Sequence, residues 1–257
     1  MGLTTRWIEP DKAADLRFSG DPITARAALE GQIREIDVII QQEAHRRRKL
    51  LIADMDSTMI ECECIDELAD YAGIKPQIAE ITERAMRGEL VFEDALRQRV
   101  RLLAGLSEAV VEECLAERVK LMDGGKALVS AIHHNGGISV LVSGGFTHFA
   151  EPVGRMLGFD RVLANSLGFA DGKLDGTVVG DIVGAETKKA TLLSVLANRR
   201  WSIEASLAVG DGANDIPMIE TAGLGVAYHA KPKTQEVASA AVRFGTLDAI
   251  AYAVVSK

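Results

Sequence analysis

The chain has 257 residues, of which 47% are hydrophobic and 26% are charged. These proportions are typical of globular proteins that bury a core, and they exclude disordered and fibrous classes. The formal net charge of −8 and the pI near 5.2 exclude a general attraction to nucleic acid or to an anionic membrane, because both would be repelled. We therefore expect a small-molecule substrate. A monomer or a homodimer is expected, and the sequence leaves the choice between them open.

The three cysteines, Cys62, Cys64 and Cys114, are an odd number without disulfide-like spacing, which indicates a reducing compartment. Cys62 and Cys64 resemble half of a metal site, but no His or Cys cluster elsewhere supplies the other half, so we interpret them as structural thiols. The N-terminus lacks the pattern of a secretory signal, and no apolar run is long enough to cross a bilayer. We expect a cytoplasmic protein.

Residues 1–48 form an N-terminal extension with weak structural signals. Pro22 to Leu29 has helical composition, and Ile36, Val38 and Ile40 alternate like a short strand. The extension is either the remnant of a separate small domain or an arm that packs on the rest of the chain.

Short apolar runs begin at Leu50 and recur through the rest of the chain, alternating with stretches of helical character. An apolar run on both faces is typical of a buried parallel strand, and strands alternating with helices predict an α/β fold with a doubly wound parallel sheet. In such sheets ligands bind outside the carboxyl ends of the strands. The predicted strands cover 50–53, 138–142, 161–164, 206–209 and 224–227, and the predicted helices between them cover 125–134, 147–157, 187–196 and 216–222.

Between residues 63 and 123 the strand signal disappears and four amphipathic helices are predicted, over 65–71, 76–86, 92–103 and 108–119. We interpret 63–123 as an all-helical cap inserted after the first core strand, with 49–62 and 124–257 as the catalytic core. A second insertion is indicated by residues 170–176, whose two Asp-Gly pairs are hairpin turn signals.

Acidic residues stand at the ends of two predicted strands. Asp54 and Asp56 follow the first strand, where two carboxylates would repel unless a cation lay beside them. Mg²⁺ is the expected cation, because it takes oxygen ligands together with phosphate oxygens. Asp211 follows a second strand between two glycines, so it would complete the oxygen shell if the two strands are neighbours.

Two anion-binding features fall in the same layer. Ser143 and Gly144 follow a strand and precede a helix, where exposed backbone N–H groups favour a phosphate. Lys188, near a predicted helix start, adds a positive charge. Lys189, one residue on, is an equally basic alternative, but the spacing to the apolar Leu192 favours Lys188.

These four segments resemble the four motifs of the haloacid dehalogenase superfamily of phosphohydrolases. Within it, the chain resembles the phosphoserine phosphatase family from about residue 49 to the C-terminus. The resemblance is carried by residues 51–61, by Glu63 and residues 65–69 and 85–88, by Phe92 and residues 99–100, and by residues 142–146 and 209–215. It implies a Rossmann-like core and an enzyme that hydrolyses O-phosphoserine, the last step of serine biosynthesis.

The resemblance assigns a role to each candidate residue. Asp54 would attack phosphorus and become an aspartyl-phosphate, and Asp56 would protonate the leaving hydroxyl and then activate water. Mg²⁺ would be held by the carboxylates of Asp54 and Asp211 and the backbone carbonyl of Asp56. Asp215 would orient Lys188 or a metal-bound water. The phosphoryl oxygens would be held by Ser143, Gly144, Lys188 and Asn214.

Substrate choice is expected to lie in the cap. The resemblance places Glu63 on the substrate ammonium and Arg99 on its carboxylate, and Phe92 would help close the pocket. Three alternatives stay open: a phosphatase for another small ester such as phosphohomoserine or a sugar phosphate, a phosphotransferase that hands the phosphoryl group to an alcohol, and a binding module without turnover. Longer relatives carry a small regulatory domain ahead of the catalytic part, and residues 1–48 resemble at most a fragment of one.

Overall fold

The computed structural model describes residues 4–255 of the protein. Residues 1–3 of the predicted N-terminal extension and residues 256–257 of the predicted core lie outside the described residues. No helix in the described range is both long enough and apolar enough to cross a membrane.

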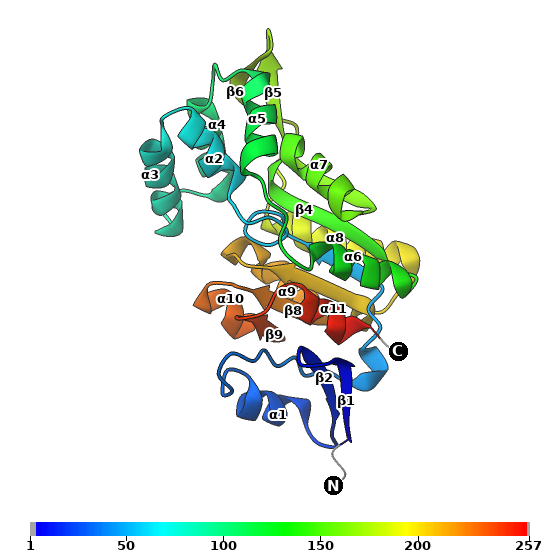
Figure 1. The fold of residues 1–257 in the computed structure, drawn as a ribbon. Coiled ribbons are helices and arrows are strands. Elements are labelled where there is room, and N and C mark those ends of the chain that lie inside the picture. The colour runs from blue at the N-terminus through cyan, green and yellow to red at the C-terminus, as the bar shows by residue number, and fades with distance from the viewer. Residues whose placement is uncertain (1–3, 256–257) are drawn as a thin grey trace.

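A seven-stranded sheet forms the centre of the molecule, in the order β6-β5-β4-β3-β7-β8-β9 (Figure 1). Neighbouring strands run parallel except β5 and β6, which are antiparallel. The strands are β3 (Leu50–Ala53), β4 (Ile138–Phe146), β5 (Arg161–Ala170), β6 (Lys173–Val179), β7 (Ser206–Gly210), β8 (Leu224–Tyr228) and β9 (Ala240–Val242).

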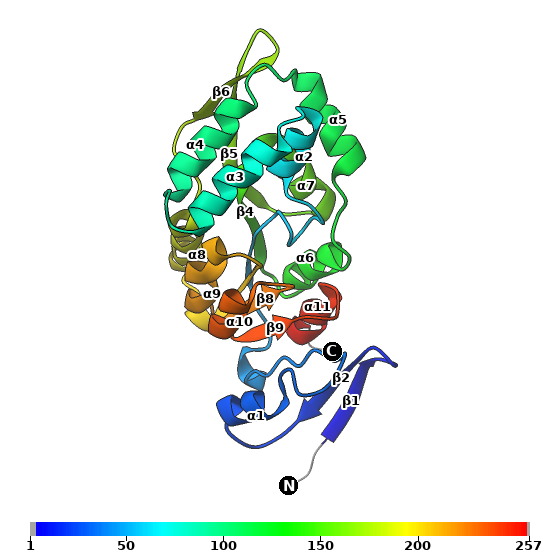
Figure 2. The ribbon, with the colours of Figure 1, turned by 90° about the vertical axis from the view of Figure 1, so that its left-hand side faces the viewer.

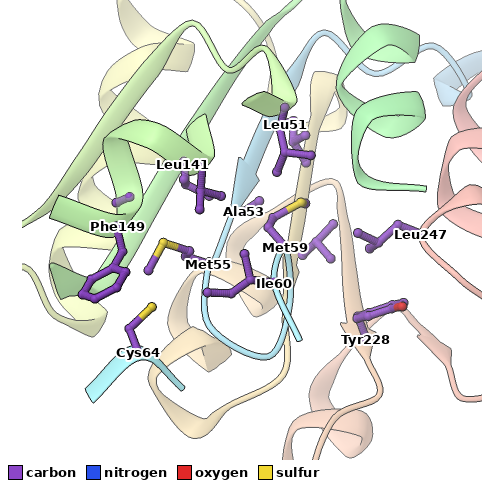
Figure 3. Close-up of a cluster of buried hydrophobic side chains, with 14 of the residues drawn as sticks. Leu51, Ala53, Met55, Met59, Ile60, Cys64, Leu141, Phe149, Tyr228 and Leu247 are labelled. Carbon is purple, nitrogen blue, oxygen red and sulfur yellow. The ribbon is translucent and has the colours of Figure 1, made fainter. Parts of the chain in front are cut away.

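Helices cover both faces of this sheet, which confirms the predicted doubly wound α/β fold. Because successive side chains of a strand point to opposite faces, Leu51 and Ala53 belong to one buried cluster and Leu50 and Ile52 to another. Figure 3 shows the first cluster, where Met55 and Met59 from the loop after β3 join it. The first face is covered by α6 (Gly125–His134), α7 (Thr147–Leu157) and α11 (Asp248–Val254), and the second by α8 (Ala185–Arg199), α9 (Ile216–Thr221) and α10 (Pro232–Val237).

The five predicted strands are all present, and the structure corrects the ends of two of them. The strand that begins at Arg161 was expected to stop at Ala164, but β5 runs on to Ala170. The strand that begins at Ile138 was expected to stop at Val142, but β4 runs on through the glycines to Phe146. Its pairing with β5 shifts register between Val142 and Phe146, so the polar residues lie in an irregular part of the strand. β9, a three-residue strand at the sheet edge, was not predicted.

Five helices lie between β3 and β4 in the chain, and the first four are those predicted for the inserted cap. These four form a layer beyond the carboxyl end of β3 (Figure 2). Lys75 and Pro76 open the second of them, where proline suits the first helical turn. The helices are α2 (Cys64–Tyr71), α3 (Lys75–Met86), α4 (Phe92–Leu102) and α5 (Glu108–Arg118). The division of the chain into extension, core and cap at 48, 62 and 123 stays a prediction.

The hairpin of β5 and β6 packs against the cap helices through contacts between β6 and α4. Asp171 and Gly172 form its turn with positive φ values of 50° and 71°, as expected for an Asp-Gly pair. The second pair, Asp175 and Gly176, lies within β6 and makes no turn between strands. Leu174 exchanges backbone hydrogen bonds of 2.8 Å with the loop after α4, which joins the hairpin to the cap helices.

The N-terminal segment differs from the prediction in two ways. It begins with an antiparallel hairpin that was not predicted, formed by β1 (Thr4–Glu9) and β2 (Ala13–Arg17). The predicted helix is present as α1 (Pro22–Leu29), opened by Asp21, whose carboxylate accepts the N–H of Thr24 at 2.8 Å. The predicted strand over residues 36–40 is wrong. Asp37 there accepts backbone N–H groups of residues 243–245, so side-chain contacts hold this stretch in place of a ladder. A short helix, η1 (Glu43–His45), follows.

Candidate active site

Asp54 and Lys188 form a buried ion pair at the carboxyl end of β3. The backbone N–H of Asp54 still donates to Val209 at 3.0 Å, so the residue extends the ladder between β3 and β7. Lys188, from the first turns of α8, is fully buried, and its Nζ lies 2.7 Å from Asp54 Oδ1. The backbone N–H of Met55 also donates to Asp54 Oδ1, at 2.8 Å. One carboxylate oxygen of Asp54 is thus fixed from two sides.

Asp215 completes this ion cluster. Its Oδ1 lies 2.6 Å from Lys188 Nζ, and its Oδ2 accepts the backbone N–H groups of Asp211 at 3.1 Å and Gly212 at 3.0 Å. A Cβ at Gly210 would lie 2.4 Å from Asp215 Cγ, so only glycine permits this approach. Burial alone would lower the pKa of Lys188, but Asp215 and Asp54 outweigh it and raise that pKa. The lysine therefore stays charged.

Three carboxylates of this cluster could hold a cation together. One oxygen each of Asp54, Asp211 and Asp215 lies within 4.8 Å of the others. Burial, followed by the charge of Asp54, raises the pKa of Asp211 to about 7 and that of Asp215 to about 6. Lys188 alone leaves three carboxylates around one positive charge. The donor set therefore fits a hard divalent cation that takes oxygen ligands.

Asp56 and Ser143 lie beside each other next to this cluster. A Cβ on Gly145 would lie 2.9 Å from Asp56 Oδ2 and 3.0 Å from Ser143 Oγ, so both groups border the same glycine. Ser143 is fully buried, and its Oγ accepts the Gly145 N–H at 2.8 Å. Burial, followed by the charges of Glu63 and Asp54, raises the pKa of Asp56 well above its ordinary value. The protonated form of Asp56 is favoured.

Glu63 and Arg99 enter from the cap side with opposite charges. Glu63 immediately precedes α2, and its Oε1 accepts a hydrogen bond of 2.7 Å from Ser57, a residue held at φ 53°. Arg99 lies on α4, where its guanidinium donates to the Thr82 hydroxyl at 3.4 Å. Burial lowers the pKa of Arg99, and the charges of Asp66, Glu63 and Asp56 act against this. The hydrogen bond from Ser57 places Glu63 against the acidic loop after β3.

Phe92 lies over the glycines of the core. A Cβ on Gly144 would lie 3.2 Å from the end of the Phe92 ring, and one on Gly184 would lie 3.5 Å from its edge. Phe92 opens α4, so the first turn of this cap helix closes on β4 and on the start of α8. The ring therefore lies against the backbone next to Ser143.

Three other residues considered in the sequence analysis make no side-chain hydrogen bond or ion pair described above with Asp54, Lys188 or Asp215. Asn214 lies in the short helix η3 (Ala213–Asp215), between the two acidic residues of that loop, and is half-buried. Lys189 is also half-buried, but Lys188 is the lysine in the ion cluster. Cys64 is a buried free thiol, and its backbone N–H donates to Asp56 Oδ1 at 3.4 Å. A further short helix, η2 (Ile203–Ala205), precedes β7.

Two polar residues that support the site were missed from the sequence. Asn165 is buried at the carboxyl end of the central part of β5, donates to Gly144 O at 2.8 Å and accepts the Val183 N–H at 2.8 Å. It therefore ties the glycine tip of β4 to the loop before α8. Thr58 is fully buried and donates to Asp211 Oδ1 at 3.3 Å. The signal for Asn165 was an amide at the end of a predicted strand, level with the other polar tips.

A sequence model of the haloacid dehalogenase-like hydrolases matches residues 51–220, which include the acidic loops after β3 and β7. The chain belongs to the haloacid dehalogenase-like hydrolase family. Its sequence is 45% identical over 201 residues to a phosphoserine phosphatase of Vibrio cholerae, and 46% identical over 205 residues to one of Polaromonas sp.. Both matches cover 78% of this chain, with 61% of the Vibrio cholerae relative and 87% of the Polaromonas relative.

Solved structures of the haloacid dehalogenase-like family share this fold. A phosphoserine phosphatase described as a phospho-aspartyl intermediate analogue is 37% identical, with a TM-score of 0.71 over 77% of this chain and 94% of its own. The chain spans 61% and 64% of the lengths of the first two curated relatives, from Vibrio cholerae and Haemophilus influenzae. Residues 51–220, which the family model matches, contain the ion cluster and the cap helices.

Proposed function

We propose that the chain is a Mg²⁺-dependent phosphatase that hydrolyses O-phosphoserine to serine and phosphate through an aspartyl-phosphate on Asp54. The observation that carries this proposal is the buried Lys188 Nζ, 2.7 Å from Asp54 Oδ1 and 2.6 Å from Asp215 Oδ1. A fixed carboxylate beside a permanent positive charge is arranged to meet a phosphate ester. Positioning and charge neutralisation must supply most of the rate acceleration that such esters need.

In the first step an oxygen of Asp54 forms a bond to phosphorus while the bond from phosphorus to the seryl oxygen breaks. Lys188 and the Met55 N–H hold Asp54 Oδ1, so the orientation of the carboxylate is set before the substrate arrives. The seryl oxygen is a poor leaving group without a proton. Asp56 supplies that proton, and its raised pKa favours the protonated form that a general acid needs.

In the second step water replaces Asp54 on phosphorus. Asp56, now ionised, takes a proton from the water, whose oxygen bonds to phosphorus as the bond to the Asp54 oxygen breaks. Asp54 returns as a carboxylate and inorganic phosphate leaves. Ser143, the Gly144 N–H, Lys188 and Asn214 are the proposed partners of the phosphoryl oxygens through both steps.

Asp54, Asp211 and the backbone carbonyl of Asp56 are the proposed ligands of Mg²⁺, with Asp215 beside them. When bound, the ion would neutralise charge on the carboxylates and on the phosphoryl oxygens. The Thr58 hydroxyl orients Asp211, and the two backbone N–H groups on Asp215 Oδ2 orient Asp215. These contacts hold mutually repelling carboxylates close enough to share one cation.

Glu63 and Arg99 are the proposed partners of the amino acid head group. An ammonium and a carboxylate on one carbon need one partner of each sign, and Glu63 before α2 and Arg99 on α4 offer one of each. A sugar phosphate would give neither residue a partner. Phe92 over Gly144 would exclude water from the bound ester.

The relatives support the same substrate and mechanism, since several carry the name phosphoserine phosphatase and one solved relative is described as a phospho-aspartyl intermediate analogue. This activity would belong to serine biosynthesis. All three cysteines are free thiols, which supports the proposed cytoplasmic location.

The test is phosphate release by the purified full chain from phosphoserine, phosphothreonine, phosphohomoserine and a sugar phosphate, with Mg²⁺ and with chelator. We expect turnover that favours phosphoserine and that stops in chelator and returns with added Mg²⁺. Added alcohols should not divert the phosphoryl group. Preference for the sugar phosphate, or full activity in chelator, would contradict the proposal.

A further inference from the structure

Ser57 has an unusual backbone conformation beside the proposed catalytic residues. It directly follows Asp56 in the loop after β3, and its φ of 53° lies in the left-handed region. That region favours glycine, because the Cβ of any other residue crowds the backbone there. Non-glycine residues in this region concentrate at functional sites, where the surrounding structure holds them. A serine at this point therefore indicates a use for its side chain.

The loop after β3 holds this conformation from several sides. The backbone N–H of Ser57 donates to the Cys62 carbonyl at 3.2 Å. The Met55 carbonyl accepts the N–H groups of residues 58–60 at 2.8 to 3.2 Å, so the chain turns tightly just after Ser57. The side chains of residues 58–60 are fully buried, and Figure 3 shows Met59 within the buried cluster. The place of the Ser57 hydroxyl is thus set by the core.

The hydroxyl of Ser57 is directed at Glu63. Ser57 Oγ donates to Glu63 Oε1 at 2.7 Å. Glu63 immediately precedes α2, so its backbone leads into the cap, whereas Ser57 belongs to the loop of the core. The chain therefore joins this loop to the start of the cap twice, through the Ser57 N–H on the Cys62 carbonyl and through the hydroxyl on the carboxylate. The second contact holds a rotatable carboxylate in one orientation.

The same hydrogen bond opposes the loss of charge on Glu63. Burial raises the pKa of Glu63, and the Ser57 hydroxyl is the largest of the contributions that lower it. The charges of Asp54 and Asp66 raise this pKa further, and the charge of Lys231 lowers it. The hydroxyl donates to the ionised carboxylate, which is the form that binds an ammonium.

We propose that Ser57 is a positioning residue for substrate selection, whose hydroxyl fixes the Glu63 carboxylate to receive the ammonium of an amino acid phosphate ester. This inference rests on the proposed function, in which Glu63 binds that ammonium. With Oε1 engaged by Ser57, Oε2 of Glu63 is the oxygen offered to the substrate. Ser57 acts through Glu63 and does not touch the reacting atoms. It therefore affects which ester is preferred and leaves the phosphoryl transfer itself unchanged.

Two esters that differ only in the ammonium test this proposal on the full chain. They are phosphoserine and phosphohydroxypropionate, which is phosphoserine without its amino group. Ser57→Ala should lower kcat/KM for phosphoserine by about three- to tenfold, less than a direct hydrogen bond to a charged group because the contact acts through Glu63. The loss should appear as a higher KM with kcat unchanged, since binding is affected and chemistry is not. Both constants for phosphohydroxypropionate should stay at the wild-type value.

A double-mutant cycle shows whether Ser57 acts through Glu63. Glu63→Gln alone should lower kcat/KM for phosphoserine by a larger factor than Ser57→Ala does. Adding Ser57→Ala to Glu63→Gln should then bring no further loss, because the carboxylate that the hydroxyl fixed is gone. Two independent losses that multiply in the double variant would overturn the proposal.

Ser57→Gly separates positioning from folding. Glycine relieves the positive φ, so this variant should melt at a higher temperature than Ser57→Ala, while both should show the same loss with phosphoserine. Arg200→Gly is the matched control, because Arg200 has the same φ of 53° just after α8. It should change the melting temperature and leave kcat/KM for both esters unchanged.

The outcomes distinguish this inference from the proposed function. A loss confined to phosphoserine in Glu63→Gln, with no loss in Ser57→Ala, would overturn the inference and leave the proposed function standing. Equal losses with both esters in Glu63→Gln would instead remove Glu63 from ammonium binding, and the inference would fail with that assignment. A lower kcat for both esters in Ser57→Ala would also contradict the inference, since it would place the hydroxyl among the reacting groups.

Discussion

Lys188 Nζ lies 2.7 Å from Asp54 Oδ1, and both side chains are closed off from solvent. Lys188→Met would remove the only lysine in the ion cluster and leave Asp54 and Asp215 facing each other. Breaking a buried ion pair on one side costs about 3 kcal/mol of unfolding free energy. We expect that loss in urea titration with chelator present, together with a fall in kcat of about 10² to 10³.

Lys189→Met is the matched control, since the two lysines are adjacent on α8 and only one reaches the cluster. It should change the unfolding free energy by no more than about 0.5 kcal/mol and leave turnover unchanged. Equal effects of the two substitutions would show that Lys188 has no special place in the site.

Asp56→Asn separates the two steps of the reaction. A nitrophenolate leaves without a proton, whereas a serine alkoxide does not, so the variant should phosphorylate Asp54 from nitrophenyl phosphate but not from phosphoserine. With the aryl ester we expect one rapid equivalent of nitrophenol followed by slow turnover. Asp54→Asn should give no such burst. A rapid burst with phosphoserine in Asp56→Asn would remove the acid role from Asp56.

Arg99 donates a hydrogen bond of 3.4 Å to the Thr82 hydroxyl. Substitutions of Arg99 and of Thr82 therefore both test the role of Arg99 in substrate recognition. Arg99→Ala should lower kcat/KM for phosphoserine by about 10- to 100-fold, the value of a charged hydrogen bond, with little change for nitrophenyl phosphate. Thr82→Val should lower kcat/KM for phosphoserine by about threefold, the value of a weak neutral hydrogen bond. Thr82→Ser keeps the hydroxyl and should retain the wild-type kcat/KM. Equal losses on both substrates would contradict the assignment of Arg99.

The layout of the site could be predicted because its residues follow strands, and strand tips of a parallel sheet share one edge. Asp54, Ser143 and Asp211 each came after an apolar run, so fold and site were inferred together. Lys188 could be chosen over Lys189 on helical spacing. The grouping of Asp215 with the other carboxylates depended on a loop whose backbone turns at Gly212, and no periodic pattern describes such a turn.

The helix of the N-terminal segment was predicted, but its hairpin could not be, because the apolar residues of the hairpin do not follow the usual rule. Pattern methods assume that apolar side chains face a core, and Trp7 and Leu16 face outward. The alternation over residues 36–40 misled for a related reason, since Asp37 fixes that stretch through contacts distant in sequence. Thr82 and Asn165 also act through tertiary contacts, and a lone Thr or Asn carries no periodic signal.

Asp160 provides a test of stability against pH. Burial acts to raise the pKa of Asp160, but the Ser139 N–H at 2.8 Å and His133 at 2.8 Å outweigh it and hold that pKa below its ordinary value of 3.8. A depressed pKa stabilises the fold above the unfolded value, and that stabilisation is lost as pH falls through the folded value. Asp160→Ala should therefore flatten the fall in stability below about pH 4.

Asp181→Ala, at an exposed loop residue, is the control for this measurement and should keep the wild-type slope. Melting temperatures between neutral pH and pH 3 would show the difference. A wild-type slope in Asp160→Ala would mean that its contacts with Ser139 and His133 do not affect the titration.

The central claim is that phosphorus bonds to Asp54, and chemical trapping tests it most directly. The protein is mixed with phosphoserine and Mg²⁺, quenched during turnover, and treated with borohydride, which reduces an acyl phosphate to an alcohol. Peptide mass spectrometry should then find homoserine at position 54, only when phosphoserine and Mg²⁺ are both present. Intact Asp54 during full turnover, or homoserine at position 56, would contradict the account.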